Sequence, residues 1–136
     1  MQAEIYHLSE QLGSALLQQG TTVTTAESCT GGGVAHAITA VAGSSSWFNC
    51  GFVTYANSAK QRMLGVPSDI IERDGAVSEA VVRQMAICAA EEAGADYAVA
   101  ISGVAGPGGG SADKPVGTVW FAWRSPKGVK AEKYLF

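Results

Sequence analysis

Apolar residues recur every three or four positions in two stretches of the chain, and this spacing predicts two amphipathic helices. In the first stretch, Ile5, Leu8, Leu12 and Leu16 share one face of the expected helix. Gly20 follows where a helix-ending glycine is expected. The apolar stripe of this helix is expected to pack on a sheet.

The second helix is expected to begin after Ser78, a favourable N-cap residue, and to end near Gly94. Glu79 falls in its first turn, where an acidic side chain interacts favourably with the helix dipole. The buried side of this helix is predicted to consist of Val81, Val82, Met85, Ile87 and Ala89.

Runs of β-branched and other apolar residues predict the strands. Shorter helices are expected between some of these runs, over residues 34–41 and 59–64, and the turn Ser125-Pro126-Lys127-Gly128 predicts a closing hairpin. The expected strands cover residues 21–26, 52–55, 97–101, 116–124 and 129–135.

Alternating strands and helices followed by a hairpin are typical of an α/β fold. We expect a single domain over residues 1–136, with a mixed sheet and helices packed on its faces. A hydrophobic fraction of 47% and a charged fraction of 15% agree with a compact domain.

Charge and cysteine content narrow the functional classes. The net charge is −3 and basic residues are scattered singly, so we expect no nucleic-acid partner. The start of the chain has no basic leader and no apolar run of membrane length, so we expect a cytoplasmic protein without a membrane partner. Cys29, Cys50 and Cys88 lack the spacing of a zinc site or a disulfide framework, and no metal is expected.

The stretch TTAESCTGGG, residues 24–33, joins an expected strand to an expected helix. Ser28 comes just after the strand, where ligands collect in parallel and mixed sheets. Thr30, Gly31 and Gly32 would bring backbone N–H groups close to a phosphate or to the oxyanion of an acyl-transfer intermediate, and the pattern fits both. The P-loop, dinucleotide and G-x-S-x-G patterns do not match.

A nucleophilic serine needs a base, and Lys60 is the remaining candidate because His7 and His36 lie away from the expected strand ends. Lys60 closes the stretch FVTYANSAK, which also contains Tyr55. If the two strands are parallel neighbours, both residues share a sheet edge with Ser28, and a Ser-Lys pair is a known variant of the catalytic triad. A solvated surface lysine is the alternative.

Cys29 is a competing nucleophile because its thiol lies beside a helix start, although such a thiol usually has a histidine partner. The glycine-rich loop 102–115 leaves the strand 97–101 at the same sheet edge. Its Ser102, Gly103 and Gly106 are candidates for backbone contacts to a substrate; the alternative is a flexible connection to the hairpin.

Several of these motifs occur together in one known family. TTAESCTGG, AGSSSWF, GFVTYANSAK, GAVSE, ISGVAGPGGG and KPVGTVWFA, in this order, resemble the CinA C-terminal domain family in its stand-alone form, the PncC-type nicotinamide-nucleotide amidases. The resemblance covers nearly the whole chain.

The resemblance implies hydrolysis of nicotinamide mononucleotide to nicotinate mononucleotide and ammonia, in pyridine nucleotide (NAD) recycling. It places the family's serine nucleophile on Ser28 and its lysine on Lys60, with Tyr55 beside them, and it implies no cofactor and no metal. The alternative is a catalytically silent mononucleotide-binding or regulatory module of the competence- and damage-inducible CinA type.

Members of this family normally continue beyond the position of Phe136 with a segment that contains Gly-Asp-Arg and leads into a helix. We expect the present chain to lack this tail, so that no phosphate-binding arginine can be assigned from it. Trp47, Phe48, Trp120 and Trp123 form an aromatic-rich set, for which core packing is the default interpretation and a dimer contact the more specific one. With the second interpretation, we expect a homo-oligomer.

Overall fold

The strands of the computed structural model, which describes residues 1–136, form one five-stranded sheet in the order β2-β1-β3-β4-β5. β1 is parallel to both β2 and β3, whereas β4 is antiparallel to β3 and to β5. The mixed sheet and the closing hairpin predicted from the sequence are confirmed. The strands are β1 (Val23–Glu27), β2 (Phe52–Val53), β3 (Tyr97–Gly103), β4 (Thr118–Ser125) and β5 (Gly128–Leu135).

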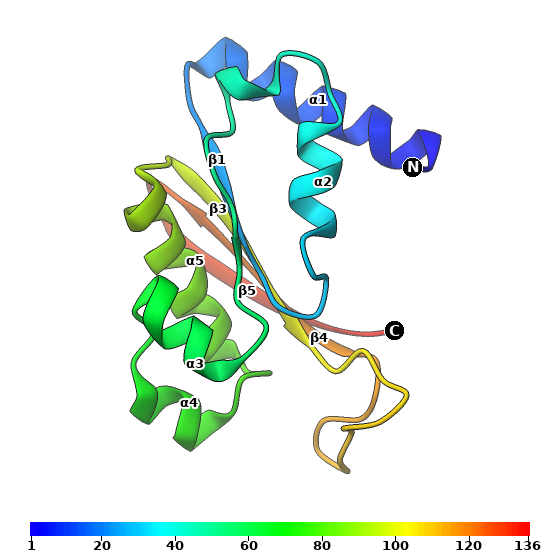
Figure 1. Cartoon of the computed structure of the whole chain (residues 1–136), viewed down its shortest axis with the longest axis vertical. Helices are drawn as coiled ribbons and strands as arrows, with labels where there is room; N and C mark the ends of the chain where they lie inside the picture. Colours follow the sequence, from blue (N-terminus) through cyan, green and yellow to red (C-terminus); the bar gives the residue numbers. More distant parts are fainter.

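Helices cover both faces of this sheet, with α5 and the short α3 and α4 on one face and α1 and α2 on the other (Figure 1). A 3-10 turn, η1 (Ser44–Ser46), precedes β2, and a π-helical turn, η2 (Lys60–Leu64), continues α3. No helix is long and apolar enough to cross a membrane. The helices are α1 (Ala3–Gln19), α2 (Gly33–Thr39), α3 (Asn57–Ala59), α4 (Ser68–Asp74) and α5 (Glu79–Ala93).

The caps of the two long helices are those expected from the sequence. Gly20 and Gly94 end α1 and α5 with φ of 67° and 63°, a left-handed conformation that glycine adopts without steric cost. The Ser78 side chain accepts a hydrogen bond from Val81 N at 3.3 Å and so begins α5.

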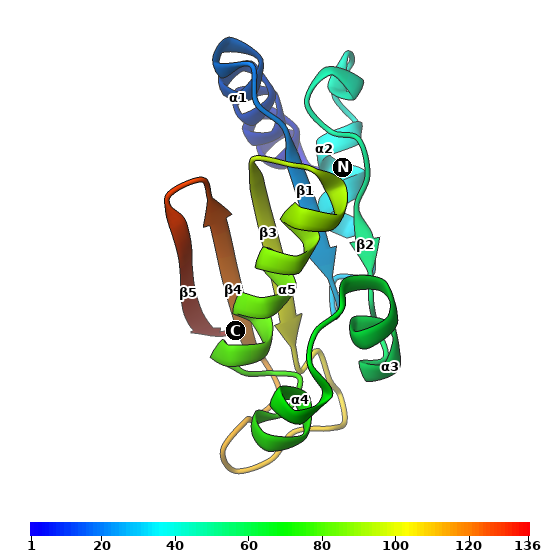
Figure 2. The same ribbon diagram turned by 90° about the vertical axis from the view of Figure 1, so that its left-hand side faces the viewer.

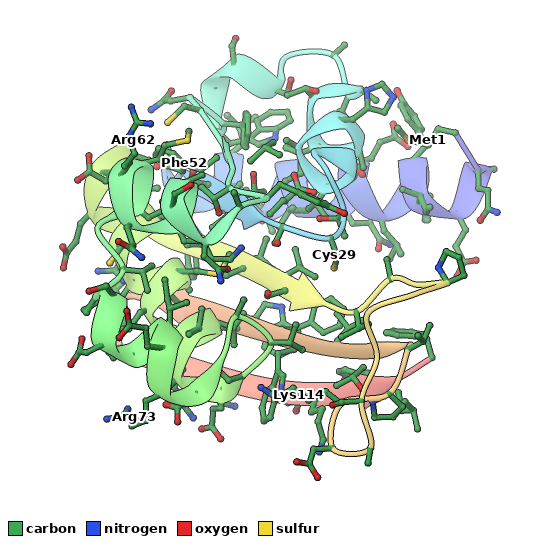
Figure 3. All side chains as sticks on the ribbon, turned by 60° about the horizontal axis from the view of Figure 1, so that its bottom comes forward. Met1, Cys29, Phe52, Arg62, Arg73 and Lys114 are labelled. Carbon is green, nitrogen blue, oxygen red and sulfur yellow. The ribbon has the colours of Figure 1, made fainter.

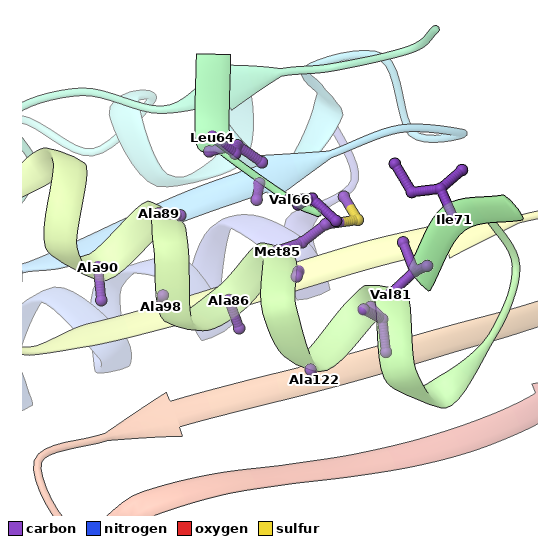
Figure 4. Packing of buried hydrophobic residues seen from close by; sticks show 13 residues of the cluster. Leu64, Val66, Ile71, Val81, Met85, Ala86, Ala89, Ala90, Ala98 and Ala122 are labelled. Carbon is purple, nitrogen blue, oxygen red and sulfur yellow. The ribbon is translucent and has the colours of Figure 1, made fainter. Parts of the chain in front are cut away.

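The main core lies between α5 and the sheet (Figure 4). Val81, Val82, Met85 and Ala89 are fully buried there, as predicted, and alanines on α5, β1, β3 and β4 allow close packing. Ile87, expected on the same side, is half-buried. This packing covers β1 and β3, and both strands end where the candidate site lies.

The opposite face is less well covered. Leu16 packs there with Val23, Ile38 and Trp47, but Ile5 and Leu8 of α1 are 43% and 56% exposed. The expectation that the whole apolar stripe packs on the sheet is therefore wrong. α1 lies across one end of the sheet beside α2, and only its C-terminal part reaches the core (Figure 1).

Candidate active site

The carboxyl ends of β1, β2 and β3 meet at one edge of the sheet and form a cleft of about 310 Å³ there. Ser28 directly follows β1, and its N–H donates to Ile101 O at 3.0 Å, which extends the pairing of β1 with β3. Figure 3 labels Cys29 at this edge, close to the loop that leaves β3. The cleft is lined by Ser28, Cys29, Tyr55, Lys60, Ala76, Val77, Ser102, Gly103, Val104, Ala105, Gly106, Gly108 and Gly109.

Lys60 is completely buried beside the serine. Its Nζ lies 3.1 Å from Ser28 Oγ, 2.8 Å from Thr54 O and 3.2 Å from Tyr55 O. No carboxylate forms an ion pair with it. The alternative of a solvated surface lysine is thus wrong, and the expected meeting of Lys60 with Ser28 is confirmed.

Burial lowers the pKa of Lys60 from its ordinary value of 10.5, and the nearby Cys29 opposes this effect only in part. A neutral lysine amine has two N–H donors and one lone pair. When the donors point to Thr54 O and Tyr55 O, the lone pair is left for the hydroxyl proton of Ser28. The two backbone carbonyls therefore hold the amine in the orientation that a base for Ser28 requires.

The turn after Ser28 is held by a buried glutamate. Glu27 has 0% exposure, and its carboxylate accepts hydrogen bonds from Thr30 Oγ1 at 2.6 Å, Val34 N at 2.9 Å and Ala35 N at 3.0 Å. These bonds tie the end of β1 to the start of α2. Gly32, with φ of 102°, allows the chain to reverse between them.

Backbone donors remain available next to the serine hydroxyl. The N–H groups of Cys29 and Thr30 have no hydrogen-bond partner in the protein, whereas Gly31 N donates to Ser28 O at 3.1 Å. The N–H groups of Cys29 and Gly103 both lie near the Cys29 thiol, where they favour a negative charge. These two donors lie just after β1 and at the end of β3, beside the Cys29 thiol, and are candidates for stabilising an oxyanion in the cleft.

Burial raises the pKa of the Cys29 thiol, an effect larger than the opposing influence of the two N–H groups and of Lys60. A raised pKa leaves less thiolate at neutral pH, and no histidine lines the cleft that contains the thiol. The geometry therefore favours Ser28 over Cys29 as the nucleophile.

The other candidates from the sequence fall into two groups. Cys29, Gly103 and Gly106 line the cleft, and Ser102 lines it as well, although its hydroxyl donates to Ala76 O at 2.9 Å. Thr30, Gly31 and Gly32 do not line it and instead shape the turn.

Tyr55 lies at the mouth of the cleft with a side chain that is 72% exposed and forms no hydrogen bond. Tyr55 contacts the buried Lys60 amine through its carbonyl oxygen and not through its phenol.

Sequence reasoning missed this role of the Tyr55 carbonyl and the roles of Thr54 O and Glu27. A glutamate at the end of a β-branched run was the available signal, because glutamate is uncommon in buried strands.

The family and its members match this chain over most of its length. The model of the CinA C-terminal domain matches residues 5–136. A protein of Escherichia coli K12 named nicotinamide-nucleotide amidohydrolase PncC is 61% identical over 126 residues, which are 93% of this chain and 76% of that protein. The protein of the same name in Pseudomonas putida is 54% identical, over 95% of this chain and 81% of its own length.

Solved structures give the same answer for the fold. The competence/damage inducible protein CihA of Agrobacterium tumefaciens superposes with a TM-score of 0.97 at 44% identity, over 100% of this chain and 83% of that one. The competence damage-inducible protein A of Klebsiella pneumoniae superposes with a TM-score of 0.94 at 40% identity, over 97% and 82% of the two chains. The α/β fold and the resemblance seen in the sequence are confirmed, and the chain belongs to the CinA C-terminal domain family.

Proposed function

We propose that this chain is an amidohydrolase that converts nicotinamide mononucleotide to nicotinate mononucleotide and ammonia, with Ser28 as nucleophile and Lys60 as base. The observation that carries the proposal is the 3.1 Å contact between the buried Lys60 Nζ and Ser28 Oγ. The names of the relatives from Escherichia coli and Pseudomonas putida supply the substrate.

In the first half of the reaction, Lys60 Nζ takes the proton of Ser28 Oγ as the oxygen attacks the carboxamide carbon. The negative charge that develops on the carbonyl oxygen is stabilised by the N–H groups of Cys29 and Gly103. The C–N bond then breaks, and the proton on Lys60 passes to the leaving nitrogen. Ammonia departs, and an ester of Ser28 remains.

In the second half, a water molecule gives a proton to Lys60 and attacks the ester carbon. The ester bond breaks, the proton on Lys60 returns to Ser28 Oγ, and the carboxylic acid product leaves and loses its remaining proton to the solvent. The same amine accepts and donates each proton, so the mechanism needs no other titrating side chain. The Tyr55 phenol, at the mouth of the cleft, is available to the leaving ammonia or to the pyridine ring.

The remaining surface of the cleft suits a small polar substrate. Its volume of about 310 Å³ is at the lower end of the range for ligand pockets. Gly103 at the end of β3 and Gly106, Gly108 and Gly109 of the following loop line one side, where their backbone N–H groups can contact the ribose or phosphate.

The substitution Ser28→Ala tests the proposal because it removes the nucleophile and leaves the backbone donors in place. We expect ammonia release from nicotinamide mononucleotide to fall by at least about 10³-fold. The matched variant Cys29→Ala should keep activity within a few-fold of the parent. Labelling by a fluorophosphonate, which reacts with activated serines, should disappear in Ser28→Ala and persist in Cys29→Ala.

Two results would contradict the proposal. Loss of activity in Cys29→Ala with full activity in Ser28→Ala would assign the chemistry to the thiol. Calorimetric binding of nicotinamide mononucleotide by the parent chain without ammonia release would indicate a binding module. Cytoplasmic location and the lack of a nucleic-acid partner remain predictions from the sequence.

A further inference from the structure

The outer edge of β5 pairs with no other strand, and Val129 O at its start accepts a hydrogen bond from Arg83 Nη1 at 2.9 Å. β5 has eight residues, pairs only with β4, and forms one border of the sheet (Figure 2). The opposite border, β2, has only two residues. A long free edge presents unpaired backbone N–H and C=O groups that can pair with another strand.

The hydrogen-bond pattern of the hairpin shows which residues of β5 face outward. Phe136 N donates to Gly117 O at 2.8 Å, so the backbone groups of Phe136 point to β4. Along an antiparallel strand these groups alternate in direction. The N–H and C=O groups of Val129, Ala131, Lys133 and Leu135 therefore point away from the sheet.

The charges along the strand select one way for two copies to pair. In an antiparallel pair centred on Ala131, each Lys130 lies opposite Glu132 of the second copy, and each Val129 lies opposite Lys133. The centre of a two-fold pair must be one of the outward-facing residues: a pair centred on Lys133 places that lysine opposite itself, which is unfavourable, and a pair centred on Val129 or Leu135 overlaps only at one end of the strand. Lysines on an edge strand normally discourage pairing with another strand. In this register, however, Glu132 of the second copy lies opposite Lys130 and balances its charge.

We propose that β5 is a self-association edge through which two copies of this chain form a two-fold dimer centred on Ala131, joining their sheets into one continuous sheet. This proposal is independent of the amidase function. Ala131 exchanges both of its outward backbone hydrogen bonds with Ala131 of the second copy. The two Lys130–Glu132 pairs flank this centre and fix the register.

The sheet surface beside these pairs gives the dimer additional apolar contact. Phe121 stacks on Trp123 with ring centroids 5.9 Å apart and meets Tyr134 edge-on at 5.4 Å. Trp123 is opposite Lys130 in the hairpin and is 40% exposed, and Tyr134 is 45% exposed. In the dimer the aromatic rows of both copies lie on the same face of the joined sheet, on either side of the charged pairs.

Charge reversal tests the dimer and its register together. We expect the parent chain to sediment as a dimer at high micromolar concentration and to dissociate on dilution. Lys130→Glu or Glu132→Lys alone places like charges opposite each other twice, so each should raise the dissociation constant by at least about tenfold. The double variant Lys130→Glu, Glu132→Lys should restore the parent value.

Two further variants complete the design. Lys127→Glu changes the net charge as much as Lys130→Glu but lies in the hairpin turn, and it should leave dimerisation unchanged. Ala131→Pro removes an outward N–H at an edge, where proline is tolerated, and it should give a folded monomer. A parent chain that stays monomeric, or single reversals that do not weaken the dimer, or a double variant that does not recover, would overturn the proposal.

Discussion

The Lys60 amine has an environment that few lysines have, since it is fully buried and contacts one hydroxyl and two carbonyls but no acid. Because no carboxylate pairs with the amine, the cost of desolvating the ammonium form outweighs the opposing effect of Cys29, and the pKa of Lys60 falls. A lower pKa raises the fraction of neutral amine at neutral pH. This is the direction that a general base requires.

The reaction rate is therefore expected to rise with pH and to level off above the pKa of Lys60, at a midpoint below 10.5. Either kcat/KM for the amide or the rate of fluorophosphonate labelling of Ser28 measures this profile. Cys29→Ala should retain the profile, because the thiol is not the base. Lys60→Met should abolish the rise, and a midpoint at or above 10.5 in the parent would show that burial does not activate the amine.

The turn between β1 and α2 is the element that presents Ser28 and its neighbouring N–H groups. It is kept in shape by the Glu27 carboxylate, which accepts one side-chain and two backbone hydrogen bonds. A buried carboxylate that loses one of these donors is left partly unsatisfied, which is costly. The geometry around the serine thus depends on contacts on the side of the turn away from the cleft.

Thr30→Val tests this dependence, because valine has the shape of threonine but cannot donate to Glu27. We expect a loss of about 1–3 kcal/mol in the free energy of unfolding and a fall in kcat with little change in KM. Thr30→Ser keeps the hydroxyl and should keep most of both. The comparison needs urea unfolding curves and steady-state kinetics, and equal behaviour of the two variants would contradict a role for the hydroxyl.

Elements with strong local signals were predictable from the sequence. The caps at Gly20, Ser78 and Gly94 and the turn before Gly128 depend on neighbouring residues only, and the structure has each of them. The helix α4 was not predicted, and β2 is shorter than expected and excludes Tyr55. Both depend on packing against distant parts of the chain, which periodicity does not report.

Only part of the candidate site was predictable from the sequence. Ser28 and Lys60 could be paired from the sequence because parallel strands end at one edge, a rule that needs only the element order. The roles of the Thr54 and Tyr55 carbonyls could not be predicted, because every residue has a carbonyl and only coordinates show where it points.

The whole molecule is unequally packed on the two faces of its sheet. On the α5 face the helix packs closely over β1 and β3, whereas the α1 face contains an apolar groove of about 510 Å³ that Ile5, Leu8, Leu12 and Trp123 help to line. The apolar residues of α1 therefore contribute unequally to folding: Leu16 is 4% exposed and Leu8 is 56% exposed.

Two alanine substitutions compare the contributions of Leu16 and Leu8 to the free energy of unfolding. Leu16→Ala leaves a cavity in the packed cluster and is expected to cost about 2–5 kcal/mol of unfolding free energy. Leu8→Ala removes a mainly exposed side chain and should change stability by no more than about 0.5 kcal/mol. Chemical denaturation of both variants provides the values, and equal losses would mean that α1 packs along its full length.

The hydrogen bonds from the Lys60 amine to main-chain oxygens affect which residues of the cleft can change during evolution. Because the peptide backbone orients the amine that we propose as the base, side chains at the rim, including position 55, can vary without disturbing it. On the proposed mechanism, replacements at the rim are enough to accommodate other carboxamides, while the contact between Ser28 and Lys60 stays the same.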